Sequence, residues 1–256
     1  MKKLIIYSGP SCVGKGPLNN ALQTHYKEYL KEKKIGKITL HTNREMRKNE
    51  EEGEPYFFHK IPGELESLVH NNKKFISGWI RDKEQLQALD LDEAKKVFKN
   101  HDLVLLEIYH TLGAQLNRKE VLDYLSDDDI KVETIFISPL SLKEIENFKE
   151  MGIDIRNQVT KIMLLKLLRR AREIQNISLE NKKVVINLID RAQDAFNELQ
   201  NACNYDHVIV NHDGEDSDHW YLPFPIGDAK RTLEIFVELL KNPKSQSAEK
   251  WFPDTM

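Results

Sequence analysis

Residues 9–16 combine the residue types and the spacing that proteins use to bind phosphate groups. An apolar run, Leu4 to Tyr7, precedes them and predicts a buried strand, and a helical pattern follows them. Glycines let backbone N–H groups turn toward phosphate oxygens, and the start of a helix adds its dipole to the same anion. A lysine in this loop supplies a charge for the β- and γ-phosphates. The residues predicted to contact a nucleoside triphosphate are Gly9, Pro10, Ser11, Cys12, Val13, Gly14, Lys15 and Gly16.

Gly16 departs from the usual form of this loop, in which a Ser or Thr after the lysine contacts Mg²⁺. Without that hydroxyl, we expect magnesium to be held by the nucleotide, by water and by carboxylates elsewhere in the chain. The Gly-Lys-Gly form resembles the loop of adenylate kinases and their relatives. It favours a small-substrate kinase over a GTPase switch.

Size and composition indicate an ordinary soluble chain. Its 256 residues suffice for one α/β domain with insertions or a lid, and the balance is 40% hydrophobic and 31% charged. A net charge of −3 gives no overall signature of nucleic-acid binding. The two cysteines, Cys12 and Cys203, lie far apart and fit a reducing, cytoplasmic setting. No signal peptide or membrane-spanning stretch is recognisable, so we expect no membrane partner.

Apolar runs alternate with helical patterns along the chain, which is typical of a parallel α/β sheet flanked by helices. We expect strands at residues 4–8, 37–41, 56–59, 102–109, 132–138 and 206–211. We expect helices at residues 15–34, 62–72, 92–100, 112–125, 141–151, 155–176, 179–202 and 227–241.

Residues 154–203 are expected to be almost continuously helical and are rich in basic side chains. They form either a helical hairpin with solvated basic faces or a mobile lid that brings cations onto a phosphate chain. The two interpretations are compatible, and the lid is preferred. The tail from Asn242 either is mobile or docks through Trp251 and Phe252. The basic residues are Arg156, Lys161, Lys166, Arg169, Arg170, Arg172, Lys182, Lys183 and Arg191.

A second cluster lies in residues 42–58, where Arg44 and Arg47 precede Tyr56. Two guanidinium groups and a phenol suit a phosphate monoester, because the guanidinium forks pair with its oxygens and the phenol adds a directional donor. Taken alone, such a cluster is also typical of a polar surface loop.

The order of these motifs resembles the guanylate kinase family: a phosphate loop, then T-x-R-x-x-R-x-x-E-x-x-G-x-x-Y-x-F. The stretches 103–108, 135–139 and 205–211 extend the resemblance, which spans roughly residues 3–240. An insertion near 139–168 and an extra loop at 213–226 depart from it.

The resemblance implies a P-loop kinase with a parallel sheet flanked by helices, an acceptor-binding subdomain and an enlarged helical lid. It implies ATP and Mg²⁺ as cofactors and small-molecule nucleotides as substrates. The implied domain covers residues 1–241, with the tail at 242–256. Within it lie a core (1–40, 102–138 and 204–241), an acceptor-binding segment (41–100) and the lid (139–203).

The family's site residues carry over where the motifs match. The resemblance implies that Lys15 is the principal charge on ATP and that Asn211 lies beside its base. Arg44, Arg47 and Tyr56 would hold the acceptor's 5′-phosphate. The implied lid arginines are Arg191 and, in a second cluster, Arg169, Arg170 and Arg172, and Glu107 would order magnesium through water.

The positions that read guanine in the family do not match. The serine falls on Leu40, the glutamate near Ser77 and the aspartate on Tyr109. A carboxylate is the natural acceptor for guanine N1–H and N2–H₂, so losing two of them removes much of the discrimination. Ser77 and Tyr109 remain candidate substrate contacts, and Glu64, Glu66 and Asp82 are the candidate replacements for the missing carboxylates.

Three functions therefore stay open. The first is an ATP-dependent nucleoside monophosphate kinase, with GMP or dGMP as the family's default acceptor. The second is a kinase for another phosphorylated small molecule, such as a sugar phosphate, or for a modified nucleotide. The third is a non-catalytic guanylate-kinase-like binding module, although such modules generally lose the phosphate loop that is intact here.

Overall fold

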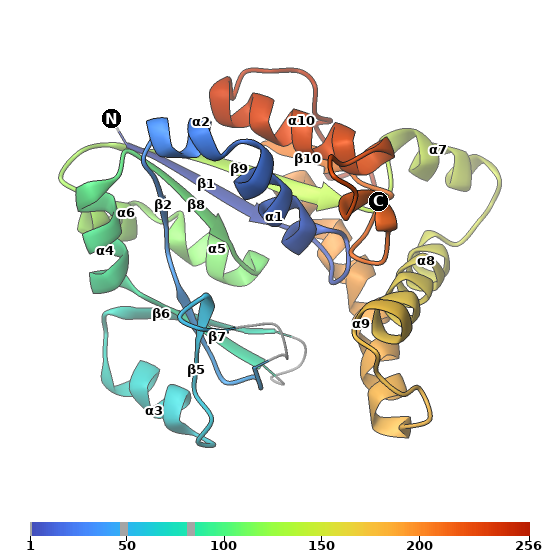
Figure 1. Ribbon diagram of the computed structural model, residues 1–256, viewed down its shortest axis with the longest axis horizontal. Helices are drawn as coiled ribbons and strands as arrows, with labels where there is room; N and C mark the ends of the chain where they lie inside the picture. The colour runs from blue at the N-terminus through green and yellow to red at the C-terminus, as the bar shows by residue number, and fades with distance from the viewer. Residues whose placement is uncertain (1, 47–50, 81–84) are drawn as a thin grey trace. The chain divides into compact units, whose positions relative to one another are not determined.

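The computed structural model describes residues 2–46, 51–80 and 85–256. The chain forms two compact units (Figure 1). Unit 1 consists of Met1–Ile6 and Lys31–Glu133, and unit 2 of Tyr7–Leu30 and Thr134–Met256. Of the described residues, none belongs to a helix long and apolar enough to cross a bilayer.

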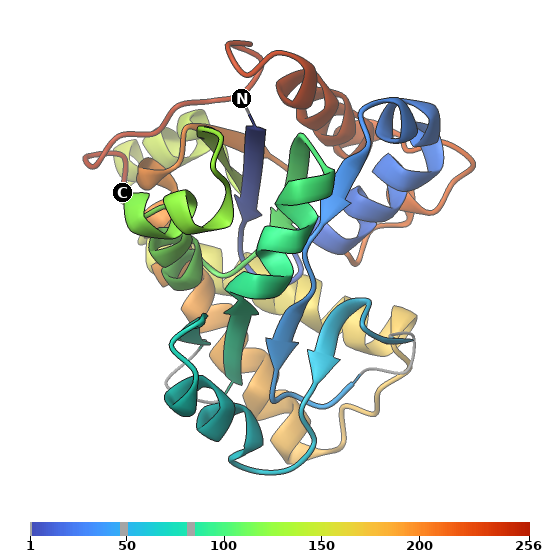
Figure 2. The ribbon, with the colours of Figure 1, turned by 90° about the vertical axis from the view of Figure 1, so that its left-hand side faces the viewer.

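Unit 1 contains a five-stranded sheet of order β4-β5-β3-β7-β6, with α3 packed against β6 and β7 (Figure 2). The β3–β5 pair is parallel, whereas β7 is antiparallel to both β3 and β6. The elements of this sheet are β3 (Leu40–Thr42), β4 (Glu51–Glu52), β5 (Pro55–Phe58), α3 (Glu64–Asn71), β6 (Phe75–Ile80) and β7 (Gln85–Asp90).

The two faces of this sheet pack against different cores. Leu86 and Ala88 of β7 point to one face and join Leu65 of α3 in a small apolar cluster. Leu89 points to the other face and joins Leu40 in the larger core of unit 1. The alternation follows from the two-residue period of a strand.

A second five-stranded sheet has the order β10-β9-β1-β8-β2. Its β2–β8 pair in unit 1 and its β9–β10 pair in unit 2 are both parallel. The predicted α/β architecture with a parallel sheet is therefore confirmed. Its strands are β1 (Lys2–Ser8), β2 (Ile35–Lys37), β8 (Leu103–Glu107), β9 (Ile130–Ser138) and β10 (His207–Val210).

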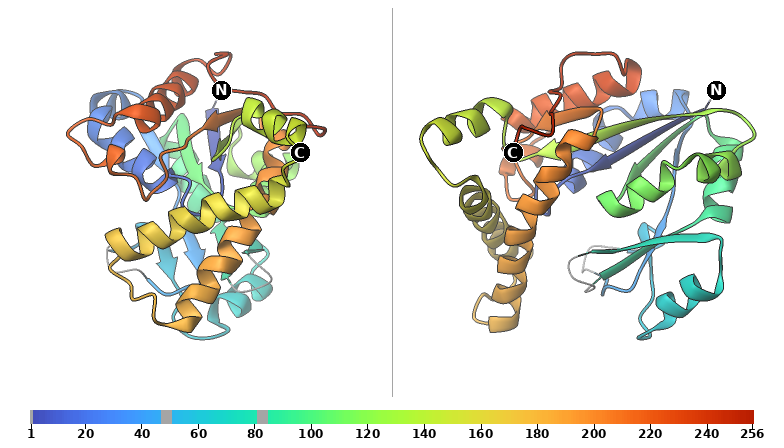
Figure 3. Two further views of the ribbon diagram at one scale, coloured as in Figure 1. Left: turned by 90° about the vertical axis from the view of Figure 1, so that its right-hand side faces the viewer. Right: turned by 180° about the vertical axis from the view of Figure 1, so that it is seen from behind.

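Helices complete both units. In unit 1, α4 packs against α6, and in unit 2, α1 lies beside α10. Helices α8 and α9 pack against each other in unit 2 (Figure 3). The bounds are α1 (Lys15–His25), α2 (Lys27–Glu32), α4 (Leu91–Asn100), α5 (His110–Leu116), α6 (Lys119–Leu125), α7 (Leu142–Glu150), α8 (Ile155–Arg169), α9 (Lys182–Gln200) and α10 (Gly227–Lys241).

Several predicted boundaries were wrong. The strands β6 and β7 were not expected, because Gln85 and Gln87 are buried polar residues that hide the apolar alternation of β7. The strand expected at 37–41 is divided between β2 and β3, and the helices expected at 15–34 and 112–125 are each broken into two.

Within the segment 154–203, the helices expected at 155–176 and 179–202 are both present, and the break between them is longer than expected. Helix α8 ends in a π-helical turn, Arg170–Ile174, and α9 begins only at Lys182. Asn176 adopts a left-handed φ of 50°, and asparagine tolerates this conformation at helix ends better than most residues. The segment is therefore a hairpin of two helices.

The C-terminal tail docks on unit 2 through one of the two aromatic residues expected to do so. Trp251 is completely buried, and its Nε1 donates to Glu249 Oε2 at 2.8 Å. Phe252 is 59% exposed. The tail also forms an isolated β-bridge between Glu249 and Val208 of β10.

Candidate nucleotide-binding site

The phosphate loop of unit 2 connects β1 to α1, as predicted. Gly14 caps the helix with a left-handed φ of 104°. A Cβ atom there would lie 2.5 Å from Asn211 Nδ2 and 3.0 Å from the Asp213 carbonyl oxygen, so only glycine fits. The first turn of α1 carries no acidic residue. Its N-terminal partial positive charge is therefore not offset by a carboxylate in that turn and favours an anion.

Lys15 folds back over the loop. Its Nζ donates to the carbonyl oxygens of Gly9 at 2.6 Å and of Pro10 at 3.0 Å. These bonds hold the ammonium group against the loop backbone, the position from which a lysine reaches the phosphates in this motif.

Asn211 joins the loop to the segment that follows β10. It is completely buried, and its Nδ2 donates to the carbonyl oxygens of Val13 and Asp213, each at 2.7 Å. Trp220 Nε1 donates to the same Asp213 carbonyl at 2.5 Å. The amide of Asn211 thus fixes the loop, while its contact with an ATP base stays a prediction.

Helix α9 brings one cation to the loop. Arg191 is half-buried, and its Nε donates to Ser11 Oγ at 3.1 Å. Its Nη2 donates to the same hydroxyl. Among the predicted lid arginines, Arg191 is therefore placed directly on the phosphate loop.

Arg169 and Arg170 instead pair with two acids of the loop after β10. Arg170 is 3% exposed and forms an ion pair with Glu215. Arg169 Nη1 lies 3.4 Å from Asp216 Oδ2. Burial alone would lower the pKa of Arg170, but the Glu215 carboxylate raises it above its usual value. Arg172 is exposed on the π-helical turn.

These ion pairs show that Arg169 and Arg170 are not simply solvated, as the interpretation of a hairpin with solvated basic faces would have them. Sequence reasoning missed Glu215 and Asp216 as partners, although they stand in an acidic run, Gly-Glu-Asp-Ser-Asp, directly after the predicted last strand. Their charge opposite a basic helix was the signal that could have identified them.

Cys12 lies inside the loop and is completely buried. Burial raises the pKa of its thiol to about 12, so the thiol is protonated at neutral pH. Its carbonyl oxygen accepts from the Glu215 N–H at 3.1 Å. Cys12 therefore acts in this loop as a small packed residue whose backbone anchors the 213–216 segment.

Unit 1 contains the second predicted cluster. The guanidinium of Arg44 lies over the rings of Tyr56 and Phe58, with its carbon 4.9 Å and 5.1 Å from their centroids. Arg44 Nη1 also donates to the Glu45 carbonyl at 2.9 Å. The structure thus brings Arg44 and Tyr56 together, and the expectation for Arg47 falls outside the described residues.

Two buried glutamines support this cluster from β7. Gln87 Nε2 donates to the Tyr56 hydroxyl at 3.1 Å. Gln85 Nε2 donates to Thr42 Oγ1 at 3.2 Å, and the backbone N–H of Arg44 donates to the same hydroxyl at 3.4 Å. Both glutamines were overlooked in the sequence because β7 was not predicted.

The structure does not bring Ser77 to this cluster. Ser77 pairs with Ala88 in the β6–β7 register, and Ala88 packs into the cluster on the α3 face. Tyr56 belongs to the core on the other face.

Two further predicted site residues lie at the ends of other elements of unit 1. Tyr109 is the N-cap residue of α5, and its ring lies 4.3 Å from that of His110. Glu107 is half-buried at the end of β8.

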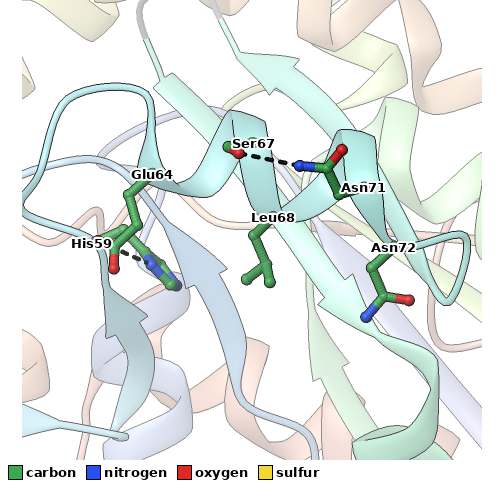
Figure 4. Close-up of a pocket in the computed structure, with 6 residues that line it drawn as sticks. All are labelled: His59, Glu64, Ser67, Leu68, Asn71 and Asn72. Atoms are coloured by element: carbon green, nitrogen blue, oxygen red, sulfur yellow. Dashed lines mark hydrogen bonds and ion pairs between the residues drawn. The ribbon is translucent and has the colours of Figure 1, made fainter.

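A pocket on the α3 side of unit 1 has a volume of about 360 Å³ (Figure 4). His59 Nδ1 lies 3.4 Å from Glu64 Oε2, and His59 Nε2 lies 2.9 Å from His41 Nδ1. Burial, chiefly, and the neighbouring His59 lower the pKa of His41. Glu64, a candidate replacement for the missing carboxylates, lines this pocket. Glu66, another candidate, accepts a hydrogen bond from Asn43 Nδ2 at 3.1 Å. The lining residues are His59, Glu64, Ser67, Leu68, Asn71 and Asn72.

Residues 1–184 match the family model described as guanylate kinase. The chain belongs to the guanylate kinase family. The matched residues include both the phosphate loop and the Arg44 cluster. Arg191 and Asn211 lie beyond the matched residues, although the expected resemblance reaches residue 240.

Known guanylate kinases are similar to this chain at moderate identity. That of Mycoplasma mobile is 38% identical over 146 residues, which are 56% of this chain and 66% of the relative, just under two thirds of its length. That of Mycoplasma pneumoniae is 26% identical over 211 residues, 82% of this chain and 70% of the relative.

The crystal structure of guanylate kinase from Anaplasma phagocytophilum is similar in fold. It matches with a TM-score of 0.53 and 19% sequence identity, over 96% of this chain and 88% of that one.

Proposed function

We propose that this protein transfers the γ-phosphoryl group of ATP to a nucleoside monophosphate. The observation that carries the proposal is the Arg191–Ser11 hydrogen bond, 3.1 Å long, at a phosphate loop that also holds Lys15. A bare glycine turn between a strand and a helix would need neither cation. Phosphoryl transfer needs alignment and neutralisation of charge more than covalent chemistry, and these groups supply both.

On the donor side, the backbone N–H groups of residues 9–16 would cradle the ATP phosphates. Lys15 would exchange its carbonyl contacts for phosphate oxygens, which are stronger acceptors for an ammonium group. Arg191 would stabilise the charge that spreads over the transferred group. The exposed Arg172 is a second candidate for that role.

On the acceptor side, Arg44 and Tyr56 would hold the 5′-phosphate. The Tyr56 oxygen accepts from Gln87, so the hydroxyl can donate its own hydrogen to a phosphate oxygen. The guanidinium of Arg44 can pair with two oxygens of the same ester. Arg47 belongs to the same predicted motif.

Magnesium suits this chain as a partner of the nucleotide. Of the described residues, no group of three His, Cys, Asp or Glu is arranged to hold a metal ion. Mg²⁺ is usually bound through one or two carboxylates, water and substrate phosphates, and Glu107 offers such a carboxylate at the end of β8. When bound, the ion would neutralise phosphate charge.

GMP or dGMP is the first acceptor to test, because the two Mycoplasma relatives are guanylate kinases. The acceptor cluster gives reason to test other bases. Tyr109 stands where the family has an aspartate, and Ser77 lies on the opposite face of the sheet from Tyr56. A kinase for a modified nucleotide or another phosphorylated molecule is therefore the second candidate.

ADP release with ATP and Mg²⁺ tests the proposal against GMP, dGMP, AMP, CMP, UMP, dTMP and sugar phosphates. We expect turnover with a nucleoside monophosphate that falls at least about a hundredfold in Arg44→Ala and in Lys15→Ala. Turnover with sugar phosphates alone would select the second candidate. ATP binding without turnover on any acceptor would contradict a kinase and favour a binding module.

A further inference from the structure

Gln87 has a buried polar atom for which the described residues offer no partner. The side chain is 5% exposed, and its Nε2 donates to the Tyr56 hydroxyl at 3.1 Å. Its Oε1 is fully buried and accepts no hydrogen bond from the described residues. Buried carbonyl oxygens are nearly always bonded, so this one requires a reason.

The sheet register places Gln87 on the same face as the predicted phosphate-binding residues. Gln87 is opposite Thr42 of β3, and Thr42 is opposite Phe58 of β5. Opposed residues point to the same face, and Tyr56 is two residues from Phe58 on that strand. Gln87, Tyr56 and the guanidinium that lies over its ring therefore share one surface.

On its other side, Gln87 is opposite Gly78 of β6. A Cβ atom at Gly78 would lie 2.7 Å from Thr111 Oγ1, so the start of α5 packs directly over this position. Gln87 thus stands between Tyr56 and the N-terminal turn of α5, which follows Tyr109. In a nucleotide whose phosphate is held by Tyr56, the groups beyond the phosphate would extend along this surface.

An amide oxygen suits a different part of the ligand than a guanidinium does. It accepts hydrogen bonds and has no hydrogen to donate, and phosphate oxygens are themselves acceptors, so it cannot be a phosphate contact. A nucleobase offers ring N–H and exocyclic amino groups as donors. When the phosphate of an acceptor nucleotide pairs with Arg44, the guanidinium would move off the Tyr56 and Phe58 rings. This movement would expose the face of the sheet that carries Gln87.

We infer that Gln87 is a specificity-determining residue whose Oε1 accepts a hydrogen bond from the base of the acceptor nucleotide. The inference rests on the proposed function, because it takes the Arg44 cluster as the acceptor site. A neutral amide pairs with one donor where a carboxylate can pair with both N1–H and N2–H₂ of guanine. Selection among bases should therefore be weaker than a carboxylate would give.

The test is calorimetric binding of GMP, AMP, CMP and UMP to the whole protein and to Gln87→Met. Methionine is unbranched and close to glutamine in size but has no strong acceptor. We expect the preferred nucleotide to lose about tenfold in affinity and the spread among bases to narrow. Equal weakening of all four affinities would overturn the inference, because Gln87 would then only support Tyr56. Unchanged affinities for all four nucleotides would overturn it as well.

Gln85→Met is the matched control, since it removes the same amide two residues away on the same strand face, where Gln85 bonds Thr42. The relative affinities for the four bases should not change in it. Gln87→Glu is the second variant and decides the question if Gln87→Met does not fold. Its carboxylate should raise the ratio of GMP to AMP affinity, and an unchanged ratio would overturn the inference.

Binding separates this inference from the proposed function. A wild-type protein that binds the panel selectively but releases no ADP would contradict the kinase and leave the role of Gln87 standing. If the wild type releases ADP and Gln87→Met keeps the same base preference, the kinase would stand and the inference about Gln87 would be overturned. Failure of wild type to bind any of the four would overturn both.

Discussion

Arg191 of α9 donates from Nε to the hydroxyl of Ser11, 3.1 Å away in the phosphate loop. Ser11 is thus held by a cation that can pair with a phosphate oxygen instead. A guanidinium pairs more strongly with an anionic oxygen than with a neutral hydroxyl. Bound ATP should therefore replace Ser11 as the hydrogen-bond acceptor of the Arg191 guanidinium.

Arg191→Met should lower kcat by about a hundredfold or more, because it removes a cation from the transferring group. Ser11→Ala removes the competing hydroxyl and leaves the cation, so kcat should stay within about fivefold of wild type. Steady-state ADP release and calorimetric ATP binding measure the two variants. If both lose activity equally, Arg191 acts by holding the loop rather than by contacting phosphate.

Gly14→Ala should weaken ATP binding by at least about tenfold. The new Cβ would meet Asn211 Nδ2 at 2.5 Å and force the loop away from the residues that fix it. Gly63→Ala is the matched control, since Gly63 also caps a helix with positive φ but has no atom within 4 Å of a Cβ. It should lose about 1 kcal/mol of stability and keep its ATP affinity. ATP affinity that survives Gly14→Ala would contradict the role of this contact.

The parts of the site that could be predicted from sequence are those formed by residues close together in the chain. The phosphate loop is contiguous, so Gly14 and Lys15 could be placed from their spacing alone. Arg44 and Tyr56 are separated by a short segment whose motif is distinctive. Each prediction depended on residues near in sequence or on a family pattern.

The missed residues depend on contacts that sequence spacing does not encode. Gln87 of β7 bonds Tyr56 of β5 across the intervening strand β3, and a buried glutamine interrupts the apolar pattern by which a strand is recognised. Glu215 pairs with Arg170 from a loop inserted after β10. Both pairs are formed only when the strand register and the helix position are fixed.

Trp251→Ala should destabilise the protein by about 3–5 kcal/mol, the usual cost of deleting a fully buried aromatic side chain. Trp251 packs in the core of unit 2 with Leu199 and Val208. Phe252→Ala is the control, since Phe252 is 59% exposed and should cost less than about 0.5 kcal/mol. Urea unfolding measures both changes. Equal free energies of unfolding for the two variants would show that the tail does not contribute to the folded unit.

His212 should make stability depend on pH. Its Nε2 lies 2.9 Å from Glu144 Oε2, and its Nδ1 is bonded to Asp228. Burial alone would lower the pKa of His212, but the hydrogen bonds with Glu144 and Asp228 raise it above its usual value. Burial would likewise raise the pKa of Glu144, whereas the Ser141 N–H and His212 lower it.

Because the folded pKa of His212 is raised, its contribution is complete below about pH 6.5, the unfolded value, and is lost as pH rises through the folded pKa. Glu144 works in the opposite sense: its contribution is present above its unfolded pKa and is lost as pH falls through the lowered one. His212→Gln should therefore destabilise the protein more at pH 6 than at pH 9. Since His212 is 43% exposed, the difference should stay below about 1 kcal/mol.

Urea unfolding at both pH values measures this difference, with His70→Gln, an exposed histidine of α3, as the control. The change in lost free energy between pH 6 and pH 9 should be larger for His212→Gln than for this control. A loss for His212→Gln that is equal at the two pH values, or larger at pH 9, would contradict a charged His212 between two carboxylates.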